Sequence, residues 1–164
     1  MSRTVRTPGP GDPGRRLALE IEPRPPVSRM LIAVLALAGI LLSVYLTMYK
    51  LGLVGELVCG TGSCERVQDS PWGVFLGLPV AAWGVVGYAM LLALAIAGLQ
   101  PRLAHSRAVA LMLFAASLVG VAFTAYLTYL EAAVIHAWCR WCLGSAAIIG
   151  LIFLCSIPGL RRAR

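Results

Sequence analysis

The chain has 164 residues, of which 59% are hydrophobic and only 13% are charged, and its mean hydropathy is +0.83. A soluble domain of this length needs more polar residues to cover its surface, so the composition excludes a soluble globular protein and indicates an integral membrane protein. The formal net charge is +7, and the Arg residues that carry it flank apolar segments. This pattern favours contact with membrane lipid and argues against a nucleic-acid-binding protein.

The N-terminal residues, 1–28, are rich in Pro, Gly and Arg and contain no apolar run, so we expect a flexible cytoplasmic tail. Arg15 and Arg16 form a twin arginine, but no hydrophobic signal core follows them. A membrane domain is predicted over residues 29–158 and a short basic cytoplasmic tail over residues 159–164.

Four apolar stretches in this domain have lengths near the roughly 20 residues that a helix needs to cross a bilayer. They are residues 30–49, 73–99, 108–135 and 141–157. The fourth is short, whereas the two middle stretches exceed the minimum, so we expect tilt or ends outside the hydrocarbon. Their continuous apolarity argues against a β-barrel, and the predicted fold is an all-α, four-transmembrane-helix bundle.

The distribution of basic residues predicts the orientation of this bundle. With both termini and the central loop on one side, that side holds eleven Arg residues and the other side three basic residues. The larger set is Arg3, Arg6, Arg15, Arg16, Arg24, Arg29, Arg102, Arg107, Arg161, Arg162 and Arg164, and the smaller set is Lys50, Arg66 and Arg140. By the positive-inside rule, we expect both termini in the cytoplasm.

An internal similarity relates the two halves of the chain. Residues 39–47 (Gly-Ile-Leu-Leu-Ser-Val-Tyr-Leu-Thr) align without a gap with residues 120–128 (Gly-Val-Ala-Phe-Thr-Ala-Tyr-Leu-Thr). Either a duplication or the recurrence of small and hydroxyl residues where membrane helices pack closely explains the match. In both cases we expect the first and third helices to present similar faces to the bundle interior.

Two cysteine pairs lie just outside apolar stretches, on the predicted exoplasmic side, where disulfides form and persist. Cys139 and Cys142 form a C-x-x-C motif where the fourth helix is expected to begin. Residues three apart share a helical face, and the unpaired amides and dipole of a helix N-terminus favour a thiolate. Arg140 adds positive charge between them. The motif therefore predicts a reactive dithiol, although zinc knuckles use the same spacing.

The other pair, Cys59 and Cys64, encloses two glycines that predict a flexible exoplasmic loop between the first two helices. Such a loop can carry a dithiol from an outside partner to the C-x-x-C motif. Exchange requires a thiolate to attack a disulfide sulfur, so the two pairs must be able to meet. We predict four catalytic cysteines on this basis.

Two alternatives give the four cysteines a structural role: a pair of static disulfides, or a tetrathiolate zinc site in a non-catalytic scaffold. The exoplasmic location argues against zinc, as do Trp138 and Trp141, which are typical interface anchors. We therefore predict no metal site. A small transporter is disfavoured because no charged residue lies in the middle of a span.

Other residues near the cysteines have weaker signals. Cys155 lies about 20 Å along the helix from Cys142 and is expected to be an inert thiol. We interpret His136 as a residue that packs at the membrane interface, in preference to a proton shuttle. We interpret Glu131 as a polar residue at headgroup level, in preference to a group that transfers protons or controls gating. Aromatic residues available to line a pocket for a flat ring are Trp72, Phe75, Trp83, Tyr88, Tyr126 and Tyr129.

These motifs together resemble the vitamin K epoxide reductase (VKOR) family, in its single-domain bacterial form. The matching residues are Cys59, Cys64, Val67, Ser70, Trp72, Phe75, 77–79 (Gly-Leu-Pro), 126–131 (Tyr-Leu-Thr-Tyr-Leu-Glu) and 139–143 (Cys-Arg-Trp-Cys-Leu). The resemblance covers about residues 30 to 157. The order of the cysteines distinguishes this family from the DsbB family, which has its C-x-x-C in the first exoplasmic loop.

The resemblance implies a four-helix bundle that encloses a membrane quinone, either menaquinone or ubiquinone. Cys142 is then expected to face the quinone and Cys139 to exchange with the loop pair, the attacking loop cysteine being unassigned. The expected quinone-site residues are Ser70, which covers the pocket, with Trp72, Phe75 and Tyr126 around it.

The same resemblance implies a place and a direction for the reaction. The loop pair is expected to oxidise a periplasmic thioredoxin-fold (DsbA-type) protein. We expect this partner to be a separate protein, since the chain ends seven residues after Ile157. A DsbA-type dithiol/disulfide pair is strongly oxidising, so re-oxidation of its dithiol needs an acceptor at least as oxidising, or one kept oxidised by respiration, such as a membrane quinone. The expected location is the bacterial cytoplasmic (inner) membrane, and the expected role is support of disulfide bond formation.

Overall fold

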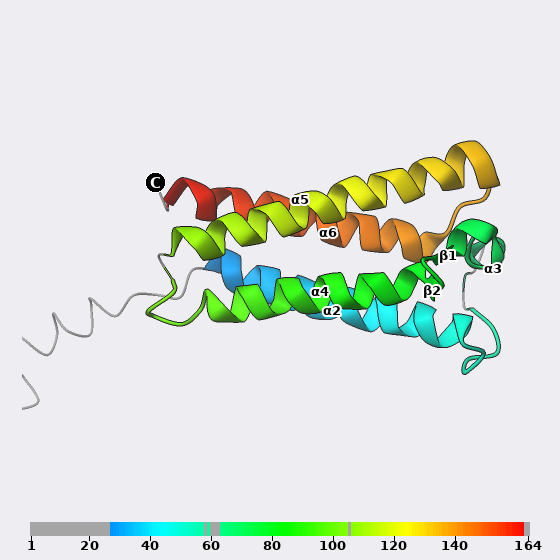
Figure 1. Ribbon diagram of the computed structural model, residues 1–164, viewed down its shortest axis with the longest axis horizontal. Helices are drawn as coiled ribbons and strands as arrows, with labels where there is room; N and C mark the ends of the chain where they lie inside the picture. Colours follow the sequence, from blue (N-terminus) through cyan, green and yellow to red (C-terminus); the bar gives the residue numbers. More distant parts are fainter. Residues whose placement is uncertain (1–26, 58, 60–62, 105, 163–164) are drawn as a thin grey trace, which may run out of the picture.

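The computed structural model describes residues 27–57, 59, 63–104 and 106–162. Four long helices form an elongated bundle (Figure 1). They are α2 (Val27–Lys50), α4 (Val80–Ala97), α5 (Arg107–Leu130) and α6 (Arg140–Arg162). Each is long and apolar enough to cross a membrane, so the predicted four-transmembrane-helix fold is confirmed.

Different segments of the chain lie at the two ends of the bundle. The beginning of α2, the end of α6 and the connection between α4 and α5 lie together at one end (Figure 1). The α2–α4 and α5–α6 connections, which contain the paired cysteines, lie at the other. The placement of the cysteine end outside the cytoplasm stays a prediction. The N-terminal tail falls almost wholly on residues 1–26, outside the described residues, and the predicted C-terminal tail is helical as far as Arg162.

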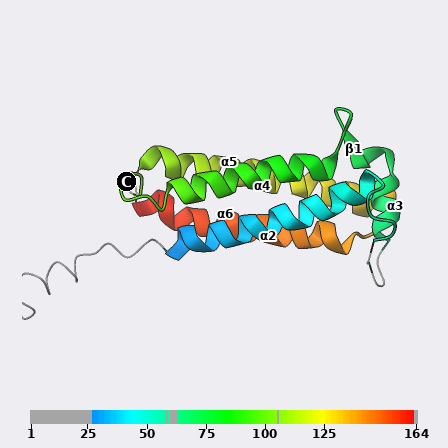
Figure 2. The ribbon, with the colours of Figure 1, turned by 90° about the horizontal axis from the view of Figure 1, so that it is seen from below.

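The second apolar stretch is helical only from Val80 onward. Residues 71–79 form instead a 3-10 turn, η1 (Pro71–Gly73), and a hairpin of β1 (Val74–Phe75) and β2 (Leu78–Pro79). Leu76 and Gly77 make its turn with φ of 53° and 81°, a left-handed conformation that suits glycine. Figure 2 shows this hairpin projecting from the cysteine end of the bundle.

The third stretch ends in an unusual way. After Leu130 the chain continues as a single π-helical turn, η2 (Glu131–Ile135), and His136 then reverses it with a left-handed φ of 53°. The backbone carbonyl of Glu131 accepts the N–H of Ala137 at 3.2 Å and closes the turn. The tight connection brings the start of α6 directly back to the end of α5. The second stretch therefore begins, and the third stretch ends, outside regular α-helix.

The helices are arranged in a ring in which α2 contacts α4 and α6, and α5 contacts the same two. A core of buried apolar side chains fills the end away from the cysteines. It includes Ile32 and Ala36 from α2, Leu91 from α4, Leu113 from α5 and Ile152 from α6. A separate buried cluster lies at the cysteine end.

The similar segments of α2 and α5 have corresponding environments. A Cβ added to Gly39 would lie 2.5 Å from the ring of Tyr88 on α4, and one added to Gly120 would lie 2.8 Å from Ile149 on α6. Because it has no side chain, each glycine leaves room for a side chain of the next long helix to pack against its backbone. The aligned hydroxyls also correspond: Thr47 Oγ1 donates to the carbonyl four residues earlier at 2.7 Å, and Thr128 Oγ1 does the same at 3.0 Å.

Candidate active site

A short helix, α3 (Cys64–Asp69), lies across the cysteine end of the bundle against η2 (Figures 1 and 2). Its first residue, Cys64, forms a disulfide with Cys59. The Cys64 side chain is fully buried, whereas that of Cys59 is only partly buried. The loop pair thus has an inward and an outward member. The predicted flexibility of the glycines between them falls on residues outside the described part of the chain.

The C-x-x-C motif lies at the start of α6, as the sequence predicts. Cys139 and Cys142 are free thiols. The backbone N–H of Cys142 donates to Cys139 Sγ at 3.3 Å, so the Cys139 side chain caps the helix where Ser or Asp often stands.

The groups around Cys139 change the pKa of its thiol. The Cys142 thiol, which donates a hydrogen bond to the Cys139 sulfur, lowers the pKa of Cys139 below its ordinary value. Burial and the neighbouring Glu131 carboxylate raise the pKa and so oppose this effect, whereas the backbone N–H of Cys142 reinforces it. The Cys142 thiol thus has the effect on the pKa of Cys139 that the sequence suggested for Arg140, whose side chain is exposed.

The two cysteine pairs meet in the buried cluster at this end of the bundle. Cys64 and Cys139, each 0% exposed, are both members of it. The segments that carry them are directly bonded, since the N–H of Ser63 donates to the carbonyl oxygen of Trp138 at 3.1 Å. Cys59 and Cys142 pack at the margin of the same cluster. Two cysteine-bearing segments that are far apart in the sequence are thus adjacent in the structure.

A cavity of about 680 Å³ begins beside these cysteines and extends into the bundle. Cys142 lines it, whereas Cys139 does not. Its walls are largely apolar side chains from all four long helices, and Val67, Gln68 and Ser70 line it at the cysteine end. Exposed residues of α4 and α5 lie on its border, among them Met90 and Val119. The cavity is therefore open sideways between these two helices, where the bilayer would be.

The sequence model of the vitamin K epoxide reductase family matches residues 30–157, which include all four helices and both cysteine pairs. The chain belongs to the vitamin K epoxide reductase family. It is therefore a membrane thiol–disulfide oxidoreductase. This confirms the family that the cysteine order and flanking residues indicate in the sequence.

Three of the four predicted quinone-site residues of this VKOR family member line the cavity: Ser70, Trp72 and Phe75. Ser70 Oγ donates to the carbonyl of Val67 at 2.7 Å and so closes the end of α3. The Phe75 ring is edge-on to Phe123 of α5, with 6.2 Å between ring centroids. The fourth, Tyr126, is 51% exposed and is not among the residues that line the cavity.

Glu131 is a site residue whose place the sequence did not indicate. Its side chain is only 2% exposed, so it is buried in the site and does not face lipid headgroups or water. One carboxylate oxygen accepts the N–H of Cys139 at 3.1 Å, and the carboxyl also forms a hydrogen bond with the Cys142 thiol. Glu131 lines the cavity as well. It therefore contacts both cysteines of the motif and the space beside them.

The remaining residues near the motif have distinct surroundings. Trp138 is exposed, as an interface anchor would be, whereas the ring of Trp141 packs edge-on against Tyr45 at 5.4 Å between centroids. His136 is exposed and its Nδ1 lies 3.2 Å from a backbone carbonyl of its own turn. Cys155 packs against the apolar core at the far end.

Proposed function

We propose that the protein is a thiol:quinone oxidoreductase that oxidises a separate exoplasmic thioredoxin-fold protein and delivers the electrons to menaquinone or ubiquinone. The observation that carries the proposal is the burial of Cys64 and Cys139 in one cluster, with Cys142 on the wall of an apolar cavity. Two cysteine pairs in one buried cluster, one of them beside a space open to lipid, can form a path from a soluble thiol to a lipid-soluble acceptor.

The first step moves an electron pair from the partner to the loop. A thiolate of the partner attacks Cys59, the less buried member of the Cys59–Cys64 disulfide, and a mixed disulfide forms while Cys64 leaves as a thiolate. The second thiol of the partner then displaces Cys59. The partner ends as a disulfide, and Cys59 and Cys64 end as a dithiol.

The second step moves the pair inward. Cys64 attacks Cys139 of an oxidised C-x-x-C motif, so the Cys64–Cys139 bond forms and the Cys139–Cys142 bond breaks. Cys59 then attacks Cys64, which closes the loop disulfide again and leaves Cys139 and Cys142 as thiols. This product state has the same pairing as the structure, with the loop disulfide formed and the motif reduced.

In the last step, Cys139 and Cys142 form a disulfide while two electrons and two protons pass to the quinone, which becomes a quinol. The residues at the cavity fit such a substrate. Apolar walls suit a flat ring and its tail, and Ser70, Trp72 and Phe75 close the cavity at the sulfur end. Glu131 lies where it can accept the proton of the Cys142 thiol as the sulfur reacts.

The experiment is quinone reduction by the purified, pre-reduced protein, followed by the absorbance change on quinol formation with menaquinone and ubiquinone analogues. We expect Cys139→Ser and Cys142→Ser to abolish quinol formation and to leave a DsbA-type partner reduced. Cys155→Ser is the matched control, because this thiol packs at the other end of the bundle, and it should retain activity. Partner oxidation that continues in Cys139→Ser and Cys142→Ser would refute the proposal.

A further inference from the structure

Gln68 is a buried polar residue that none of the cysteine motifs explains. Its side chain is 6% exposed, and it lies on α3 facing the cavity. Its amide nitrogen, Nε2, donates to Cys142 Sγ at 3.8 Å, within the longer range of hydrogen bonds to sulfur. Burial of an amide is costly unless it is hydrogen-bonded, so this contact with the sulfur offsets the cost of its position.

Cys142 has three side-chain neighbours that form hydrogen bonds with its sulfur, and they differ in chemistry. Glu131 and Cys139 are both acidic groups, and each becomes negatively charged when it loses its proton. Neither charge favours a second negative charge on Cys142. The Gln68 amide does not titrate, so it remains a donor at every pH. Of the three, it is the one neighbour that always favours the thiolate.

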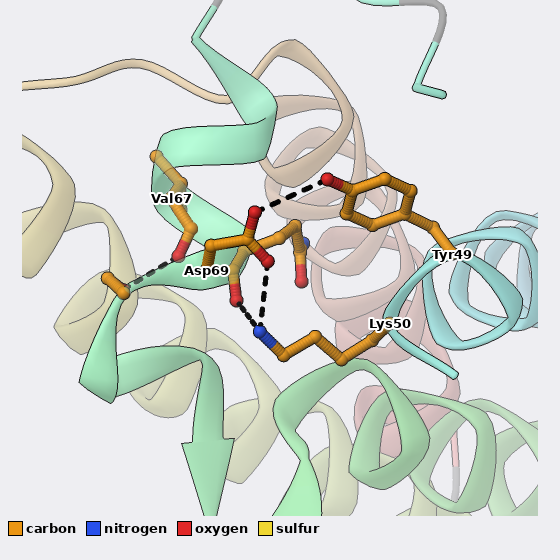
Figure 3. Close-up of polar contacts among 6 residues, drawn as sticks. Tyr49, Lys50, Val67 and Asp69 are labelled. Carbon is orange, nitrogen blue, oxygen red and sulfur yellow. Dashed lines mark hydrogen bonds and ion pairs between the residues drawn. The ribbon is translucent and has the colours of Figure 1, made fainter. Parts of the chain in front are cut away.

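The backbone of Gln68 is held in place by the end of α2. Lys50 Nζ donates to the Gln68 carbonyl oxygen at 2.6 Å and forms an ion pair with Asp69 Oδ1 at 3.1 Å (Figure 3). The hydroxyl of Tyr49 reaches the second oxygen of Asp69 at 3.4 Å. We call these contacts of Tyr49, Lys50, Gln68 and Asp69 the α2–α3 latch.

Gly73 also packs against the Gln68 carbonyl, since a Cβ added to Gly73 would overlap the carbonyl oxygen. The carbonyl is therefore in contact with both a cation and a close-packed glycine, which restricts movement of the Gln68 backbone. An exposed ion pair such as Lys50–Asp69 adds little to stability by itself. What the latch does is hold the backbone position from which the side-chain amide of Gln68 reaches Cys142.

We infer that Gln68 is a catalytic residue that stabilises the thiolate of Cys142 through its amide, and that Lys50 and Asp69 are positioning residues acting through it. The inference deepens the proposed function, since it concerns the sulfur that faces the quinone cavity. During oxidation of the motif, the Cys139–Cys142 bond forms and the electron pair and two protons go to the quinone. The amide favours the ionised sulfur before that transfer and is not consumed.

The test measures the sulfur without any quinone or partner. In the reduced full-length protein, the rate of Cys142 alkylation by iodoacetamide is followed by peptide mass spectrometry between pH 6 and 9, with Cys155 as internal reference. Gln68→Leu keeps similar volume but removes the donor, and we expect about tenfold slower labelling of Cys142 at neutral pH. Gln100→Leu changes the other glutamine of the chain, in an exposed turn at the far end, and should have no effect.

A second pair of variants tests the latch. Lys50→Met removes both donor contacts, and we expect it to slow Cys142 labelling three- to tenfold, while Lys50→Arg, which can still reach the carbonyl and Asp69, restores the rate. A purely structural role would alter thermal unfolding or Cys155 labelling as well. Wild-type labelling rates in Gln68→Leu, or equal rates in Lys50→Met and Lys50→Arg, would overturn the inference. Failure of wild-type protein to reduce quinone would instead overturn the proposed function alone.

Discussion

The contact between Gly39 and Tyr88 allows a prediction whose size follows from the structure. Gly39→Ala places a methyl group 2.5 Å from two ring carbons of Tyr88, far inside van der Waals contact. The ring cannot move away without weakening a hydrogen bond, because the Tyr88 hydroxyl donates to the carbonyl oxygen of Ser145 on α6 at 2.9 Å. Tyr88 thus joins α4 to α6 while its ring fills the groove that Gly39 leaves on α2.

The expected decrease in the free energy of unfolding of Gly39→Ala has two parts. Overpacking of a well-packed interior costs about 1–3 kcal/mol, and loss of a part-buried hydrogen bond costs about 1 kcal/mol. A total of about 2–4 kcal/mol corresponds to a fall in Tm of roughly 10 °C for a chain of this size. Because Tyr88 also lines the cavity, its displacement should raise the KM for quinone.

The assay is thermal unfolding of the purified protein in detergent, together with quinone-reduction kinetics. Gly150→Ala on α6 is the matched control, because a Cβ there meets nothing within 4 Å. Replacing a mid-helix glycine by alanine without a clash stabilises by about 0.5–1 kcal/mol, so Gly150→Ala should leave Tm unchanged or raise it. If both variants unfold at the same temperature, the close approach of α2 and α4 at Gly39 is not what holds these helices together.

Two further predictions concern the cysteines. Once quinone has oxidised its C-x-x-C motif, Cys59→Ser should accumulate a Cys64–Cys139 disulfide. Cys64→Ser, mixed with the disulfide form of the partner, should accumulate a mixed disulfide between Cys59 and the partner, because the Cys59 thiolate attacks the partner's disulfide and releases the partner's second cysteine as a thiolate. Both products are visible by non-reducing mass spectrometry, and the reverse pattern would contradict the assigned inward and outward roles. Because hydrogen bonds from Cys142 lower the pKa of Cys139, its thiolate persists as pH falls below the value at which an ordinary thiol protonates. Dithiol oxidation by quinone should therefore decline at lower pH than oxidation of free cysteine in the same buffers, and a decline at the same or higher pH would show that Cys139 is not activated.

The sequence predicted the helices and the position of the C-x-x-C motif because both depend on strong local signals. A run of about 20 apolar residues can satisfy its backbone in lipid only as a helix, whatever surrounds it. A C-x-x-C at the expected start of a helix places both sulfurs on one face. The boundary at Val80 was missed because residues 73–79 are as apolar as the helix that follows, and only the Leu76–Gly77 turn and Pro79 separate the hairpin from it.

Glu131 and Tyr126 show why the pocket was harder to predict. Cavity-lining residues of α5 and the start of η2 include Phe123, Leu127 and Glu131, which are spaced by four and share one helical face, whereas Tyr126 lies between these positions. The spacing was visible in the sequence, but the direction in which that face points was not. It depends on how α5 packs against α4 and α6, which is set by contacts such as Gly120 with Ile149.

The position of Lys50 follows from the α2–α3 latch. It is the one lysine of the chain, and the charge distribution puts it on the side that has few basic residues. A residue that opposes the positive-inside bias needs another reason to be there, and its contacts with Gln68 and Asp69 supply one.

The two ends of the bundle are therefore held by different forces. Apolar packing closes the end away from the cysteines, whereas at the cysteine end α3 is held over the cavity by a smaller buried cluster together with polar contacts at partly exposed residues. Polar contacts near water exchange partners at low cost, while a close-packed core resists opening. Movement that lets Cys59 and Cys64 change partners is thus expected at the α3 end, where the reaction requires it, with the four helices remaining in place.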